Sequence, residues 1–178
     1  MIEKEIKFEV KDIISTLNTI RDVASFSRTE YIRDIIFGTK EGKKKIRMRI
    51  TDNFLVPSIE VIYKNRARKK EQGVKVEIEE MLYKGNNVED AMKAIKKQGD
   101  FSEENSYEKM RVIYLADEAE ITLDVYPYGV WIEIEGEEDA IWKLAKKWGL
   151  KKHPASLKTL MNFILSGKRS SISKSNGM

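Results

Sequence analysis

Apolar and polar residues alternate along eight short segments of the chain, and this period of two predicts eight β-strands. In the first segment, residues 2–10, Ile6, Phe8 and Val10 would lie on one face and charged residues on the other, because successive side chains of a strand point to opposite faces. The other seven segments lie at 28–37, 44–51, 58–65, 74–82, 106–115, 119–126 and 130–136. The sequence GTKEGK at 38–43 suits a hairpin loop between antiparallel strands.

Between these strands, apolar residues recur every three or four positions, which predicts helices. Asp12 and Asn87 precede the first two and can cap them, because their side chains accept hydrogen bonds from the first turn of a helix. The helices are expected at 13–24, between Asn87 and Gly99, at 138–148 and from about Pro154.

Length and composition indicate one cytoplasmic domain. A chain of 178 residues fits a single core, here residues 1–166, while residues 167–178 are too rich in Ser and Lys to pack and are expected to be disordered. No cysteine is present, which excludes disulfides and thiolate metal sites. The charged N-terminus and the lack of a long apolar run predict neither a signal peptide nor a membrane span.

Charge is abundant in both signs, with 33 basic and 29 acidic residues and a net charge of +4. A nucleic-acid-binding protein usually gathers basic residues into one patch, so this composition gives no argument for DNA or RNA. The basic run at 64–70 could attract phosphates, but a solvated loop explains it equally well. The positions of the charges therefore carry the functional information.

Within the predicted strands, the charged residues keep the spacing of two that places them on one face. In an open sheet that face would simply be solvated. In a closed barrel of eight antiparallel strands with helices outside, the same side chains would line an inner tunnel. Seven of them are basic: Lys7, Arg47, Arg49, Lys64, Lys75, Lys109 and Arg111. Seven are acidic: Glu3, Glu5, Glu77, Glu79, Asp124, Glu133 and Glu135.

A ligand of such a tunnel must satisfy both signs of charge. A polyphosphate with Mg²⁺ or Mn²⁺ does so, because Arg and Lys hold phosphoryl oxygens while carboxylates hold hard cations.

Several of these residues form motifs, in a fixed order, that resemble one known family. Glu3 to Lys7 reads Glu-x-Glu-x-Lys, Arg47 and Arg49 follow as Arg-x-Arg, Lys75 to Glu79 read Lys-x-Glu-x-Glu, and Gly129 to Glu135 read Gly-x-Trp-x-Glu-x-Glu. The chain thereby resembles the CYTH superfamily of triphosphate tunnel metalloenzymes, which includes class IV adenylyl cyclases, thiamine triphosphatases and inorganic triphosphatases.

The resemblance implies a role for each charged residue. It implies that Mg²⁺ or Mn²⁺ is held by Glu3, Glu5, Asp124, Glu133 and Glu135. It implies that a triphosphate is bound by Lys7, Arg47, Arg49, Lys64, Lys75, Lys109 and Arg111. Lys7, beside the acidic pair, is the candidate catalytic residue that orients or helps to activate water. Glu77 and Glu79 are expected to support the site by orienting basic residues, although they could also hold a second metal.

The implied function is a metal-dependent phosphohydrolase acting on inorganic tripolyphosphate, thiamine triphosphate or a nucleoside triphosphate. One alternative is a class IV-type adenylyl cyclase that makes cyclic AMP from ATP. The cyclase branch often carries a His-Phe pair upstream of its opening motif, whereas only Met1 and Ile2 precede Glu3, which favours the hydrolase. Another alternative is a protein that binds polyphosphate or nucleotide without turnover. The sequence leaves the oligomeric state open, a homodimer included.

Overall fold

The computed structural model describes residues 2–41, 44–52, 57–66 and 74–149, which form eight strands and three helices. The strands are β1 (Ile2–Glu9), β2 (Ser25–Gly38), β3 (Lys45–Asp52), β4 (Ser58–Arg66), β5 (Lys75–Gly85), β6 (Ser102–Ala116), β7 (Ala119–Tyr126) and β8 (Gly129–Gly136). The helices are α1 (Ile13–Arg21), α2 (Val88–Lys96) and α3 (Glu138–Ala145), the last followed by a 3₁₀ turn at Lys146–Trp148.

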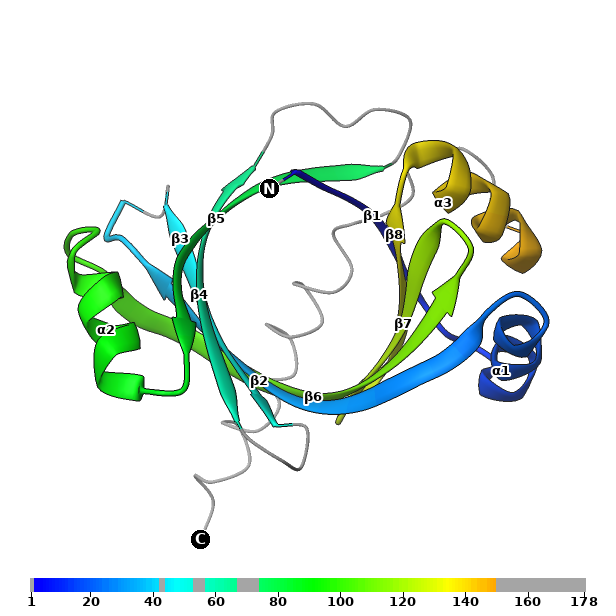
Figure 1. Ribbon diagram of the computed structural model, residues 1–178, viewed down its shortest axis with the longest axis horizontal. Helices are drawn as coiled ribbons and strands as arrows, with labels where there is room; N and C mark the ends of the chain where they lie inside the picture. The colour runs from blue at the N-terminus through cyan, green and yellow to red at the C-terminus, as the bar shows by residue number, and fades with distance from the viewer. Residues whose placement is uncertain (1, 42–43, 53–56, 67–73, 150–178) are drawn as a thin grey trace, which may run out of the picture.

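The eight strands close into a barrel in the order β1-β5-β4-β3-β2-β6-β7-β8, and every neighbouring pair is antiparallel (Figure 1). Strand β1 completes the ring: Glu5 lies opposite Lys75 of β5 on one side and opposite Glu135 of β8 on the other. The predicted closed antiparallel barrel with helices outside is therefore confirmed.

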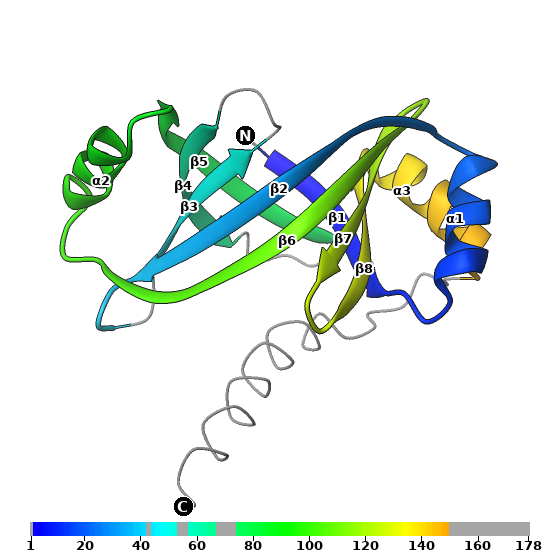
Figure 2. The same ribbon diagram turned by 90° about the horizontal axis from the view of Figure 1, so that it is seen from below.

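The core lies between the outside of the barrel and the helices. On one side of the barrel, Ile121 and Ile134 pack with Ile20 of α1 and Ile141 of α3. On the opposite side, Met48 and Val61 belong to a second buried cluster with Ala91 and Ile95 of α2. Figure 1 and Figure 2 show α2 outside the barrel on one side and α1 and α3 outside it on the opposite side. Because these apolar side chains face outward, the alternate side chains of the same strands face inward.

Several elements differ in length from the prediction. Helix α1 ends at Arg21 rather than at residue 24, because the backbone N–H groups of Val23 and Ala24 both donate to the carbonyl of Ile20. Strands β2 and β6 are longer than predicted, with 14 and 15 residues, and pair along almost their whole length. The expected helix from Pro154 and the tail at 167–178 lie outside the described residues. In the part of the chain that the structure describes, no helix has the length and apolar character needed to cross a membrane.

Candidate functional site

The inner face of the barrel carries the charged residues of the strands. All fourteen predicted site residues lie on the inner face of the barrel. The strand registers and ion pairs link them to one another, and the residues that alternate with them along the strands lie on the outer face. The fourteen residues differ in burial: Asp124 is 0% exposed and Lys109 is 4% exposed, whereas Glu135 is exposed. The outward positions between them hold β-branched or apolar residues such as Ile132 and Ile134, which fit a strand that packs under a helix.

The first group of charges, here called the Asp124 cluster, consists of Lys7, Lys109, Arg111, Asp124 and Glu133. Asp124 Oδ2 accepts from Lys109 Nζ at 2.6 Å and from Lys7 Nζ at 3.3 Å. Arg111 donates from Nε and Nη2 to the two oxygens of Asp124, at 2.6 and 2.8 Å. Glu133 accepts from Lys7 at 3.3 Å and also from Arg111. Three cations thus share two carboxylates.

The second group, here called the Glu79 cluster, consists of Arg47, Lys64, Lys75, Glu77 and Glu79. Lys64 Nζ lies 2.8 Å from Glu77 and 2.7 Å from Glu79. Lys75 Nζ lies 2.9 Å from Glu77, and Arg47 Nη2 lies 3.5 Å from Glu79. Burial alone would raise the pKa of Glu77, but Lys64 and Lys75 outweigh it and lower this pKa to about 2. Each acidic residue of this cluster is therefore an anion that holds basic side chains in place.

Glu3 and Glu5 are carboxyl groups placed near other carboxyl groups. Burial and then the nearby Glu79 raise the pKa of Glu3 to about 7. Burial and then Glu133 raise the pKa of Glu5 to about 8, although Lys75 Nζ lies 2.5 Å from it. These carboxyl groups hold protons that free carboxyl groups would lose, because their charges repel one another in a desolvated space.

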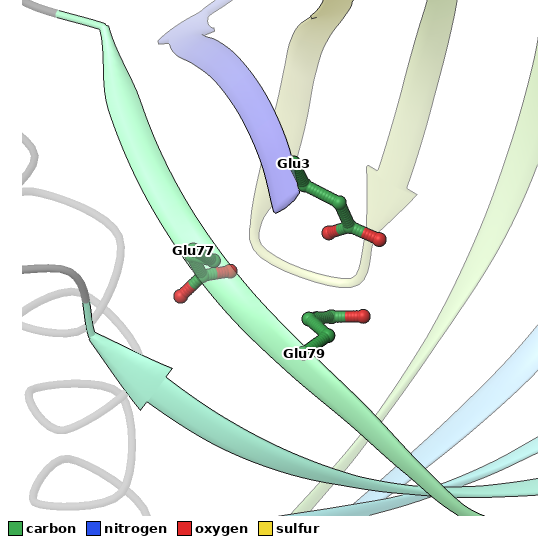
Figure 3. A group of neighbouring side chains, drawn as sticks. All are labelled: Glu3, Glu77 and Glu79. Atoms are coloured by element: carbon green, nitrogen blue, oxygen red, sulfur yellow. The ribbon is translucent and has the colours of Figure 1, made fainter. Parts of the chain in front are cut away.

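A divalent cation fits this crowding. Glu3 of β1 and Glu77 and Glu79 of β5 converge, and each offers an oxygen so that the three oxygens lie within 4.8 Å of one another (Figure 3). Carboxylate oxygens are the donors that Mg²⁺ and Mn²⁺ take, and a cation between them would remove the repulsion that raises the pKa of Glu3. The donor set therefore suits a hard divalent metal.

The two buried lysines of the Asp124 cluster differ in charge state. For Lys7, burial disfavours the cation, but Glu133 and Asp124 outweigh burial and raise its pKa to about 12. For Lys109, burial and the neighbouring Arg111 lower the pKa to about 7 despite Asp124. Lys7 is thus a permanent hydrogen-bond donor near neutral pH. The aromatic ring of Tyr126 lies beside both ammonium groups, its centroid 5.9 Å from Lys7 Nζ and 5.6 Å from Lys109 Nζ.

The sequence reasoning missed several inward-facing residues. Asp34 of β2 is 0% exposed and forms an ion pair with Arg49. Its strand carries Ile32 and Ile36 on the same inward face and Arg33 on the outer face, so the charge alternation that marks the other strands is absent there. Tyr126 and Trp131 also occupy inward positions, where they pack against each other with ring centroids 5.3 Å apart. The sequence offered one indication of the position of Asp34: a spacing of two places it on the same face of the strand as Ile32 and Ile36.

Comparison with known proteins adds a family match. The model of the CYTH domain family matches residues 1–158 of this chain. No match is found among curated proteins.

Solved structures share the barrel. The PH1012 protein from Pyrococcus horikoshii OT3 is 24% identical, with a TM-score of 0.67 over 86% of this chain and 96% of that one. An adenylate cyclase-like protein from Vibrio parahaemolyticus is 16% identical, with a TM-score of 0.64 over 92% and 98% of the two chains. HpAC1 from Hippeastrum, described as having a dominant triphosphatase activity, is 16% identical, with a TM-score of 0.60 over 93% and 96%. At these identities the likeness shows the fold.

Proposed function

The chain belongs to the CYTH family, and from this premise we propose that it is a divalent-metal-dependent triphosphatase that binds its substrate inside the barrel. The observation that carries the proposal is the enclosed array of opposite charges on the inner face, with Asp124 and Lys109 at its most buried point. The substrate is inorganic tripolyphosphate, thiamine triphosphate or a nucleoside triphosphate. The triphosphatase activity described for HpAC1, which shares the fold, supports a hydrolase over a cyclase.

The ion pairs of the barrel support a mechanism of partner exchange. A buried charge needs a partner, and removing one partner of a buried ion pair costs several kcal/mol, about 3–5 by analogy with other proteins. A triphosphate supplies new acceptors for the Lys and Arg side chains, and the carboxylates that they release become available to a metal. The carboxylates freed by the triphosphate would be the ones to hold the metal, so each ligand would favour the binding of the other.

The residues proposed to hold the triphosphate are the seven cations of the inner face: Lys7, Arg47, Arg49, Lys64, Lys75, Lys109 and Arg111. The arginines are suited to phosphate because a planar guanidinium can donate two parallel hydrogen bonds to one phosphoryl group. Lys64 and Lys75 are held by Glu77, so they are already oriented when the ligand arrives. Glu77 and Glu79 therefore keep the supporting role proposed for them, and with Glu3 they are the carboxylates that could hold a second metal.

The residues proposed to hold Mg²⁺ or Mn²⁺ are Glu3, Glu5, Glu133 and Glu135. Asp124 can join them only after Lys7 or Lys109 leaves its Oδ2, which partner exchange with the triphosphate would bring about. When bound, such a metal acts as a Lewis acid that neutralises charge on the phosphoryl oxygens.

The chain's own residues would then carry out positioning and charge stabilisation. Lys7, with its pKa raised to about 12, donates hydrogen bonds that orient the terminal phosphoryl group and the attacking water. Arg111 and Lys109 lie beside it and stabilise the negative charge that spreads over the phosphoryl oxygens in the transition state. Burial of this cluster strengthens these interactions, because the local dielectric is low.

The test is a panel of substrates with Mg²⁺ or Mn²⁺: inorganic tripolyphosphate, thiamine triphosphate, ATP and GTP, each assayed for released phosphate, pyrophosphate and cyclic nucleotide. Phosphate release that disappears with a chelator and returns with added metal supports the proposal. Pyrophosphate with cyclic AMP from ATP would instead identify a cyclase. A ligand-induced rise in melting temperature without any product would identify a binding protein.

A further inference from the structure

A buried carboxylate outside the proposed metal and phosphate sets holds one of the arginines. Asp34 of β2 lies directly opposite Arg49 of β3. Its Oδ1 accepts from Arg49 Nε at 2.8 Å and its Oδ2 accepts from Arg49 Nη2 at 2.9 Å. Asp34 is completely buried, whereas the side chain of Arg49 keeps some exposure. Asp34 therefore lies against the wall of the barrel, and the side chain of Arg49 reaches from it toward the interior.

Within the described residues, Asp34 accepts hydrogen bonds from Arg49 alone, whereas Asp124 is shared among three cations. Burial opposes the charge of Asp34, but Arg49 outweighs burial and holds the pKa of Asp34 well below its usual value. Asp34 is thus an anion near neutral pH whose two oxygens are devoted to one guanidinium. The surroundings of Asp34 differ from those of Glu3 and Glu5, because the carboxyl groups of Glu3 and Glu5 lie beside other carboxyl groups.

The fork leaves Arg49 with unused donors. A guanidinium has five N–H donors in one plane, and Asp34 uses two of them, so one on Nη2 and two on Nη1 remain without a hydrogen bond to the described residues. Because both Nε and Nη2 are held, the plane of the guanidinium cannot rotate, and the remaining donors point in a fixed direction. A long side chain that is fixed before binding loses less conformational freedom when the ligand arrives.

We propose that Asp34 is a positioning residue, which presents Arg49 to the triphosphate and takes no part in metal binding. The inference rests on the proposed function, because it assumes that a triphosphate is the ligand of Arg49. It deepens that function by assigning substrate binding, rather than metal binding or proton transfer, to the only buried aspartate of β2.

The test is a double-mutant cycle with Asp34→Asn, Arg49→Gln and the double variant. The Michaelis constant and kcat are measured with tripolyphosphate at saturating Mg²⁺, the half-saturating Mg²⁺ concentration is measured separately, and tripolyphosphate affinity is measured by calorimetry. We expect Asp34→Asn to raise KM about 10- to 100-fold, the range for loss of a hydrogen bond to a charged group, with kcat near the wild-type value. The half-saturating Mg²⁺ concentration stays unchanged. Asp139→Asn, an exposed change on α3, is the matched control.

The cycle separates positioning from structure. If Asp34 acts through Arg49, then adding Asp34→Asn to Arg49→Gln raises KM no further. Should Asp34→Asn alone unfold because Arg49 is left unpaired, comparison of Arg49→Gln with the double variant still decides the point, since neither retains the arginine charge. Additive increases in KM, or a wild-type KM for a folded Asp34→Asn protein, would overturn the inference. A shift in the Mg²⁺ requirement would overturn it as well.

Failure of the proposed function gives a different experimental result from failure of the role of Asp34. If the wild-type protein neither binds nor hydrolyses tripolyphosphate with Mg²⁺ or Mn²⁺, the triphosphatase proposal falls and the role of Asp34 falls with it. If the wild-type protein is active and the variants behave additively, the role of Asp34 alone is lost.

Discussion

Lys7 and Lys109 donate to the same atom, Oδ2 of Asp124, from 3.3 and 2.6 Å. The two lysines come from β1 and β6, and Arg111 occupies the same carboxylate from a third direction. Asp124 is therefore the anion that allows three cations to lie close together inside the barrel. Its removal would leave Glu133 as the remaining carboxylate partner of Lys7 and Arg111, and would take from Lys109 the carboxylate that it contacts.

We predict that Asp124→Asn lowers the free energy of unfolding by about 3–5 kcal/mol, because it removes the carboxylate partner of buried Lys109 and one of the two carboxylate partners of Arg111. Denaturant unfolding checks the loss, and Asp139→Asn, on the surface of α3, should change stability by less than about 0.5 kcal/mol. Added tripolyphosphate should restore part of the lost stability by replacing the missing anion. A variant as stable as the wild type would contradict the central role of Asp124.

We predict that Glu135→Gln retains the fold and requires a higher Mg²⁺ concentration for turnover. Burial and the neighbouring Glu133 raise the pKa of Glu135, so removing its charge relieves repulsion in the metal-free protein. The melting temperature without metal should therefore not fall, while the half-saturating Mg²⁺ concentration rises because an oxygen ligand is weakened. Glu133→Gln should also lose metal-dependent turnover.

The matched control for these variants is Glu118→Gln, in the exposed turn between β6 and β7. If Glu133→Gln and Glu135→Gln both keep wild-type activity at limiting Mg²⁺ or Mn²⁺, the metal assignment is wrong.

We predict that Arg47→Ala weakens binding of tripolyphosphate more than binding of monophosphate. Arg47 lies in the Glu79 cluster and the Asp124 cluster lies on other strands, and the longer tripolyphosphate can contact more of these strands than monophosphate can. Calorimetry with the two anions in the presence of Mg²⁺ measures the difference. Equal losses for both anions would contradict an extended binding site.

The metal-free protein should lose stability as pH rises from about 5 to 7, because folding raises the pKa values of Glu3 and Glu5 to about 7 and about 8. Their usual value is 4.5, so the folded state holds protons that the unfolded chain has already released. The stability that these protons contribute is fully present below pH 4.5, the pKa of a glutamate in the unfolded chain. It is lost as the pH rises through the pKa values of Glu3 and Glu5 in the folded protein. Above pH 7, Lys109, whose pKa is lowered to about 7, contributes in the opposite direction.

Thermal melting in chelator between pH 5 and pH 7 measures the effect, and Glu5→Gln should flatten the profile because it removes one of the two titrating groups. Saturating Mg²⁺ should also flatten it, since the metal takes the place of the protons. A melting temperature that is constant or rises over this range would show that these carboxyl groups do not hold their protons.

A substrate that binds only the folded state should stabilise it by an amount set by its concentration. Tripolyphosphate with Mg²⁺ at one hundred times the dissociation constant should add about 2.7 kcal/mol to the free energy of unfolding. Calorimetry at several ligand concentrations checks this dependence, with monophosphate as the control anion. A melting temperature that does not change when tripolyphosphate is added would contradict the proposed binding site.

The sequence predicted the barrel because its strands are amphipathic in an unusual sense, with isoleucines on one face and ions on the other. Ile132 and Ile134 alternate with Glu133 and Glu135, and the repetition of this pattern on most other strands, together with the resemblance of the motifs to the CYTH superfamily, favoured a closed barrel over an open sheet with a solvated face. Asp34 escaped prediction because β2 mixes apolar and charged residues on both faces. The ends of β2 and β6 were missed because polar residues such as Ser102 and Glu103 extend the strand without the expected alternation.

The partners of each ion could not be predicted. Lys7 contacts Asp124, 117 positions later in the sequence, across the intervening strand β8. Which side chains meet in this way depends on how far neighbouring strands are staggered around the barrel, and the period of two does not contain that information.

The position of β1 between β5 and β8 also dictates when the site comes into existence. Lys7 pairs in register with Glu133, so the first of the eight described strands can complete its pairing only after the eighth has been synthesised. Contacts so distant in sequence are entropically expensive to form early, which places closure of the ring late in folding. Before that step, Glu3, Glu5 and Lys7 lie on a strand with one open edge. A nascent or truncated chain that lacks β8 thus has the opening motif without Glu133 and Glu135, so the Asp124 cluster is completed only when the barrel closes.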